Sequence, residues 1–70
     1  MDRTERFYKI DQLLNDRRAV SMDTLIEELG ISRATVKRDI EYMRDRLNAP
    51  ITWDRWLRGY RFDRSLPNAS

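Results

Sequence analysis

Residues 30–41 read GISRATVKRDIE, and this stretch decides the fold. Gly30 suits the left-handed backbone position that commonly ends a helix. Ser32 is a favourable helix N-cap, because its hydroxyl can accept a hydrogen bond from the backbone amide of Thr35 or its neighbour. We therefore expect one helix to end at Gly30 and the next to begin at Ser32, with Ile31 filling the angle between them.

Apolar residues recur at helical spacing on both sides of this turn, which predicts three helices. The first runs from Thr4, its expected N-cap, to about residue 16. The second opens at Ser21, and the third ends at the stop formed by residues 48–50. The side chains expected to be buried are Phe7, Ile10, Leu13 and Leu14 in the first helix, Leu25, Ile26 and Leu29 in the second, and Val36, Ile40, Met43 and Leu47 in the third.

After the third helix the pattern becomes that of strands. Residues 51–62, ITWDRWLRGYRF, are rich in β-branched and aromatic side chains and predict a hairpin with strands near 50–53 and 59–63. The expected fold class is mainly α with a small β-hairpin, a winged helix-turn-helix of three helices plus a two-stranded wing. It should occupy residues 1–64, with 65–70 as a linker or tail.

The aromatic residues of the hairpin have two expected roles. Trp53, Tyr60 and Phe62 are expected to cover the open end of the core, because aromatic side chains on short strands of a small domain usually pack. Trp56 is left open between a wing-tip contact, a dimer contact and the edge of the core.

The composition excludes most enzyme and metal chemistry. The chain has 70 residues, enough for one small domain, and contains no cysteine and no histidine. Disulfides, thiolate zinc sites and histidine-based catalytic pairs are therefore excluded, and two glycines supply no phosphate-cradling loop. We expect no catalysis, no cofactor and no metal. The charged start, MDRTERFYKI, has no apolar run, so we also expect no signal peptide, no membrane span and a cytoplasmic location.

Positive charge is concentrated in the second half of the chain. Residues 1–31 have five basic and seven acidic side chains, net −2, whereas residues 32–70 have nine and five, net +4. Twelve of the 14 basic residues are arginine, whose planar guanidinium suits phosphates and guanine edges. Solvated arginine faces are also common in small charged proteins, so composition alone leaves both interpretations open.

A helical projection places the basic side chains of the third helix away from its apolar stripe. With Val36 at zero, Lys37 falls near roughly 100° and Arg38 near roughly 200°, and Arg33 lies at the flank. In a helix-turn-helix the second helix enters the DNA major groove, and a basic wing can reach the phosphate backbone or the adjacent minor groove. The candidate DNA-binding residues are Ser32, Arg33, Ala34, Thr35, Lys37, Arg38, Arg55 and Arg58.

These features predict sequence-specific binding of double-stranded DNA, with residues 32–47 in the major groove and the wing loop 54–59 on the backbone or minor groove. The alternative is a winged helix that binds a protein partner through its wing and third helix. The outward acidic residues Glu41 and Asp45 favour this alternative.

Two further charge clusters lie in the first half. Arg17 and Arg18 are expected either in a solvated turn or on a phosphate. Glu5 and Lys9 are expected to pair along the surface of the first helix.

Most of the chain resembles a known family. The stretches ERFYKIDQLL, VSMDTLIEELGISRATVKRDIEYMRDRL and APITWDRWLRGYRF resemble the N-terminal winged helix-turn-helix domain of bacterial WYL-domain transcriptional regulators. DeoR-type repressors and the DNA-binding domain of the biotin repressor share this plan. The most specific element is SRATVKRDI, residues 32–40, followed by the residues that frame the wing, Pro50, Ile51, Gly59 and Tyr60.

The resemblance implies a function and a set of contacts. It implies a bacterial, nucleoid-associated repressor that acts as a homodimer on an inverted-repeat operator in a full-length context, or as a monomer when this domain is alone. By the same resemblance Asp39 orients neighbouring basic groups. WYL regulators continue through ligand-sensing and dimerising regions, so an excised domain and a stand-alone regulator both stay open. The residues implied to contact the operator are Ser32, Arg33, Thr35, Lys37 and Arg38.

Overall fold

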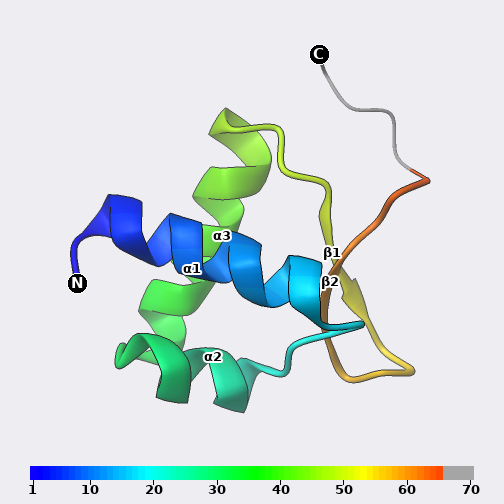
Figure 1. The fold of residues 1–70 in the computed structure, drawn as a ribbon, viewed down its shortest axis with the longest axis horizontal. Helices are drawn as coiled ribbons and strands as arrows, with labels where there is room; N and C mark the ends of the chain where they lie inside the picture. The colour runs from blue at the N-terminus through cyan, green and yellow to red at the C-terminus, as the bar shows by residue number, and fades with distance from the viewer. Residues whose placement is uncertain (66–70) are drawn as a thin grey trace.

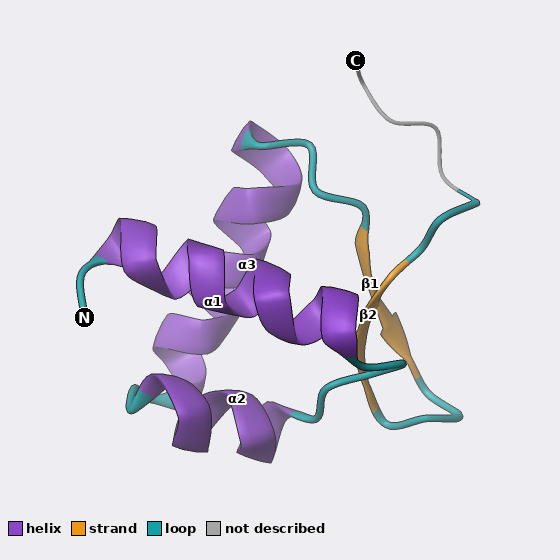
Figure 2. Cartoon of the chain, in the orientation of Figure 1, coloured by secondary structure: helices purple, strands orange, loops and turns teal. Residues whose placement is uncertain are grey.

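The computed structural model describes residues 1–65, so all of the expected tail except Ser65 lies outside the described residues. Three helices are followed by an antiparallel two-stranded hairpin (Figure 1), which confirms the predicted fold class. In Figure 2, α1 crosses in front of α3, and the hairpin lies beside the C-terminal end of α1. The elements are α1 (Arg3–Asp16), α2 (Met22–Leu29), α3 (Arg33–Arg46), β1 (Ile51–Asp54) and β2 (Gly59–Phe62).

Each helix begins with a side chain that accepts from the backbone three residues later. Ser21 and Ser32 cap α2 and α3 in this way, as the sequence predicts. The N-cap of α1 is Asp2, which accepts from the amide of Glu5 at 2.9 Å, so the expectation of Thr4 is wrong. A carboxylate is favoured there because the N-terminal end of a helix carries partial positive charge.

The two turns after α2 and α3 use left-handed residues. Gly30 has φ 65° and ends α2 as predicted. After α3, Asn48 has φ 55°, and the amide of Ala49 donates to the carbonyl of Met43 at 3.0 Å. Leu47 is the C-cap of α3 and is 53% exposed, so its expected burial is wrong. Leu47 lies one turn beyond Met43, the last residue of α3 in the core, at the end where the chain leaves the helix.

The hairpin is joined to the helices by one further bridge. Its strands pair from Ile51 with Phe62 to Asp54 with Gly59, close to the predicted bounds. Val20, between α1 and α2, exchanges two backbone hydrogen bonds of 2.8 Å with Tyr60. A Cβ at Gly59 would lie 2.8 Å from the carbonyl oxygen of Val20, so only glycine permits this approach. The bridge fixes the wing relative to the helices.

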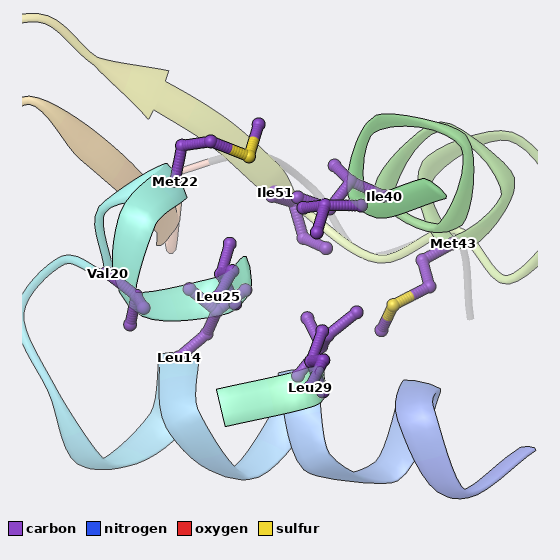
Figure 3. Packing of buried hydrophobic residues seen from close by; sticks show 10 residues of the cluster. Leu14, Val20, Met22, Leu25, Leu29, Ile40, Met43 and Ile51 are labelled. Atoms are coloured by element: carbon purple, nitrogen blue, oxygen red, sulfur yellow. The ribbon is translucent and has the colours of Figure 1, made fainter. Parts of the chain in front are cut away.

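The core lies among the three helices and the start of β1 (Figure 3). The expected stripe residues Phe7, Leu13 and Ile26 are only partly buried. Three residues outside the predicted stripes complete the core, namely Val20, Met22 and Ile51. The buried hydrophobic residues are Ile10, Leu14, Val20, Met22, Leu25, Leu29, Val36, Ile40, Met43 and Ile51.

Candidate nucleic-acid interface

The start of α3 presents the predicted side chains to solvent. Ser32, Arg33, Ala34, Lys37 and Arg38 are exposed, while the apolar stripe on the opposite side of the helix is buried. Thr35, also a candidate, is half-buried, and its hydroxyl lies 3.0 Å from that of Ser32. The candidate residues of α3 therefore share one accessible end of the helix.

Asp54 organises the loop of the wing. One carboxylate oxygen accepts from the amides of Trp56 and Leu57, each at 2.9 Å, and the other accepts from the Nε of Arg61 at 2.8 Å. The amide of Leu57 and the guanidinium of Arg61 hold the pKa of Asp54 below its ordinary value. Sequence reasoning missed this role, although aspartate at the first position of a turn was a usable signal.

Arg58 closes the wing loop in an unusual conformation. It has φ 54°, a left-handed value that side-chain-bearing residues other than asparagine and aspartate rarely adopt. Both arginines of the loop, Arg55 and Arg58, are exposed. Strained residues of this kind persist where the surrounding structure fixes them, here through the hydrogen bonds that Asp54 makes.

A shallow groove of about 510 Å³ connects the wing with the start of α3. It brings Arg33 from α3 together with Arg55 and Arg58 from the wing. The start of α2 and the side chain of Trp53 also line it, which the sequence did not predict. The lining residues are Ser21, Met22, Asp23, Arg33, Trp53, Arg55 and Arg58.

Trp53 lies mostly outside the core. It is 47% exposed and packs edge-on against Tyr60, with ring centres 5.0 Å apart. The expectation that Trp53 covers the core is therefore wrong, whereas Tyr60 and Phe62 do pack against it. Alternation places Trp53 on the same face of the strand as Ile51, but it lies two residues nearer the wing loop, where it lines the groove.

Asp39 anchors α3 to α1. It is 3% exposed and accepts from the guanidinium of Arg6 through both oxygens, at 2.6 and 3.2 Å. This hydrogen bonding raises the pKa of Arg6 above its ordinary value. Asp39 does hold a basic group, as the resemblance implies, but this group is Arg6 of α1 and not one of the candidate DNA-binding residues. Its place at roughly 300° from Val36, beside the apolar stripe, was a signal that it faces another helix.

The candidate basic residues differ from Arg6 and Arg61, which pair with buried or half-buried carboxylates. Within residues 1–65, no ion pair or side-chain hydrogen bond involves the five candidate cations, Arg33, Lys37, Arg38, Arg55 and Arg58. Their charge is therefore available to a ligand.

The other charge clusters lie elsewhere. Lys9 is 3.9 Å from Glu28 of α2, so the expected pair with Glu5 is wrong; both groups are partly exposed, and such a pair contributes little. Arg17 and Arg18 are exposed and line a separate hollow at the end of α1 that shares no residue with the groove.

Two findings concern other kinds of site. Among residues 1–65, no three acidic, cysteine or histidine side chains gather closely enough to hold a metal ion. No helix in this described part of the chain is long and apolar enough to cross a bilayer.

Comparison with known families assigns the chain to one of them. Residues 5–61 match the family described as HTH domain, and this match covers most of α1, all of α2 and α3, and most of the hairpin. Comparison with curated proteins and with solved structures gives no significant match. In helix-turn-helix domains the second helix of the motif enters the DNA major groove. The chain therefore belongs to the HTH domain family, as a helix-turn-helix DNA-binding domain.

Proposed function

We propose that this domain is the sequence-specific DNA-binding module of a bacterial transcriptional repressor of the WYL or DeoR-like type. Residues 32–47 occupy the major groove, and the wing loop 54–59 lies on the adjacent backbone or minor groove. The observation that carries the proposal is the groove shared by Arg33, Arg55 and Arg58, whose guanidinium groups pair with no carboxylate among residues 1–65. The bacterial WYL or DeoR-like type is supported by the resemblance of residues 32–40 and of the wing.

The roles divide between base edges and phosphates. Arg33, Lys37 and Arg38 extend from the accessible end of α3 toward base edges or phosphates, and Ala34 lets the helix approach closely or touches a thymine methyl. The hydroxyls of Ser32 and Thr35, together with the wing arginines, suit phosphate oxygens. The function is binding without catalysis, and it needs no cofactor.

The site on DNA follows from the expected assembly. A homodimer in a full-length context would place two copies of α3 on the half-sites of an inverted repeat, whereas the domain alone would bind one half-site as a monomer. This arrangement would act in the bacterial cytoplasm, at the nucleoid.

The test is a selection of duplexes from a random-sequence pool at near-physiological salt. Wild type should enrich one motif, and Arg38→Ala should lose or relax it. Arg17→Ala removes the same charge outside the groove and should enrich the wild-type motif. Lys37→Ala should reduce the slope of log K against log salt by about 0.9 if this ammonium contacts one phosphate. Salt-insensitive binding by wild type would contradict the proposal.

A protein-binding winged helix is the second candidate. The 84% exposure of Trp56, together with the exposed acidic residues Glu41 and Asp45, favours it. This candidate requires that the domain bind a protein saturably, that Trp56→Ala abolish this binding, and that the domain retain no duplex in the selection.

A further inference from the structure

The tip of the wing carries the most exposed large apolar side chain among residues 1–65. Trp56 is 84% exposed, and its neighbour Leu57 is also exposed. Neither belongs to the core or packs against it. An indole gains much from burial at an interface, and tryptophan is among the residues that most often dominate binding. Trp56 is therefore a candidate contact residue that takes no part in the core and does not line the groove.

The backbone holds this tip in one shape before any partner binds. The amides of Trp56 and Leu57 both donate to Asp54, and Asp54 is itself held by Arg61. Arg58 ends the loop in its left-handed conformation. A side chain on a preformed loop loses less conformational freedom on binding than one on a loop that must first be ordered.

The charge around Trp56 indicates the chemistry of its partner. The guanidinium of Arg55 lies 5.5 Å from the centre of the indole ring, and Arg58 is exposed on the same loop. A surface that accepts an aromatic plane and two cations together must offer flat apolar faces beside negative charge. The base pairs of a DNA duplex are such faces, and phosphates lie beside them.

We propose that Trp56 is a wedge that enters the minor groove next to the site of α3 and partly unstacks one base step there. The proposal rests on the proposed function, because it requires α3 in the major groove. Arg33, Arg55 and Arg58 line one groove, so DNA held by α3 passes beside the wing. Apolar wedges in minor grooves bend the duplex, and pyrimidine–purine steps such as TA and CA unstack most readily. Trp56 thereby adds sequence preference at a step that α3 does not read.

The test uses the whole chain and the duplex it selects. 2-Aminopurine, which brightens when it unstacks, replaces adenine in turn at each position that flanks the motif. Wild type should raise the fluorescence at one flanking step, whereas Trp56→Ala should abolish this rise and weaken binding about tenfold. Trp56→Phe should retain part of both effects. Tyr8→Ala, which removes an exposed aromatic residue from α1, should behave as wild type.

Selection with the variants separates the wedge from the reading of bases by α3. Trp56→Ala should lose the preference at the flanking step and keep the central motif, whereas Arg38→Ala should do the reverse. If Trp56→Ala binds within about twofold of wild type, or binds weakly with the same 2-aminopurine signal, the wedge is overturned and the proposed function stands. If wild type retains no duplex, the wedge and the proposed function are both overturned. A protein would then be the expected partner of the exposed indole.

Discussion

Replacing Gly59 by alanine tests how the wing is attached to the helices. The added Cβ would lie 2.8 Å from the carbonyl oxygen of Val20 and 2.9 Å from its carbonyl carbon. Ordinary contact at this position begins at 3.4 Å. Strand β2 must therefore move away by roughly half an ångström, since these atoms belong to the backbone and not to a flexible side chain. The movement acts directly on the two hydrogen bonds between Val20 and Tyr60.

The expected loss follows from those two hydrogen bonds. Each contributes about 1 kcal/mol, and the displacement also loosens the packing of Tyr60, so the free energy of unfolding should fall by about 2–3 kcal/mol. Urea denaturation followed by tryptophan fluorescence measures this loss. Affinity for DNA should fall as well, because the wing arginines move relative to Arg33.

Gly30→Ala is the matched control. A Cβ at Gly30 meets nothing within 4 Å, so only the left-handed backbone, φ 65°, opposes the substitution. The free energy of unfolding of Gly30→Ala should fall by only about 1 kcal/mol. If Gly59→Ala destabilises the domain no more than Gly30→Ala does, the close approach of β2 to Val20 is not a constraint and the reasoning is refuted.

Three further predictions concern single side chains. Because folding lowers the pKa of Asp54 from its ordinary value of 3.8, the contribution of Asp54 to stability is present above that value and is lost as pH falls through the folded value. Asp54→Asn should therefore flatten the dependence of stability on pH below about pH 4 in urea titrations, and an unchanged dependence would contradict this. Arg58→Gly should raise stability by about 0.5 kcal/mol, because glycine relieves the left-handed backbone, but should weaken DNA binding. Asn48→Gly, outside the groove, should leave DNA binding unchanged, and equal affinities for both variants and wild type would count against a role for Arg58. Arg6→Met leaves the buried carboxylate of Asp39 unpaired and should lower the melting temperature, and adding Asp39→Leu should restore most of it; a double variant less stable than Arg6→Met would reverse this conclusion.

The features predicted correctly from the sequence depend on short-range signals. The caps at Ser21 and Ser32 and the turn at Gly30 are each set by hydrogen bonds or backbone conformation within a few residues. The change from a helical to a strand pattern after residue 50 is likewise visible in residues 51–62 alone. Such local preferences survive folding here because the tertiary structure agrees with them.

The features missed depend on contacts between distant residues. The resemblance implied that Asp39 orients neighbouring basic groups, but it did not identify Arg6, 33 residues earlier, as its partner across the interface between α1 and α3. The bridge between Val20 and Tyr60 joins segments that no local pattern relates. The groove at the candidate site could not be predicted for the same reason, because Arg33 of α3 meets Arg55 and Arg58 of the wing only in the folded chain.

The most direct test of the central claim is a map of the DNA-binding surface by NMR. The amide resonances of the 15N-labelled domain would be followed while the selected duplex is added, with a scrambled duplex of equal length as the control. The account predicts that shifts concentrate in residues 32–38, in the wing loop 54–59 and at the start of α2, and that they are larger with the selected duplex. Shifts that concentrate instead around Tyr8 and Leu47, on the exposed surface of α1 and the end of α3, would contradict it.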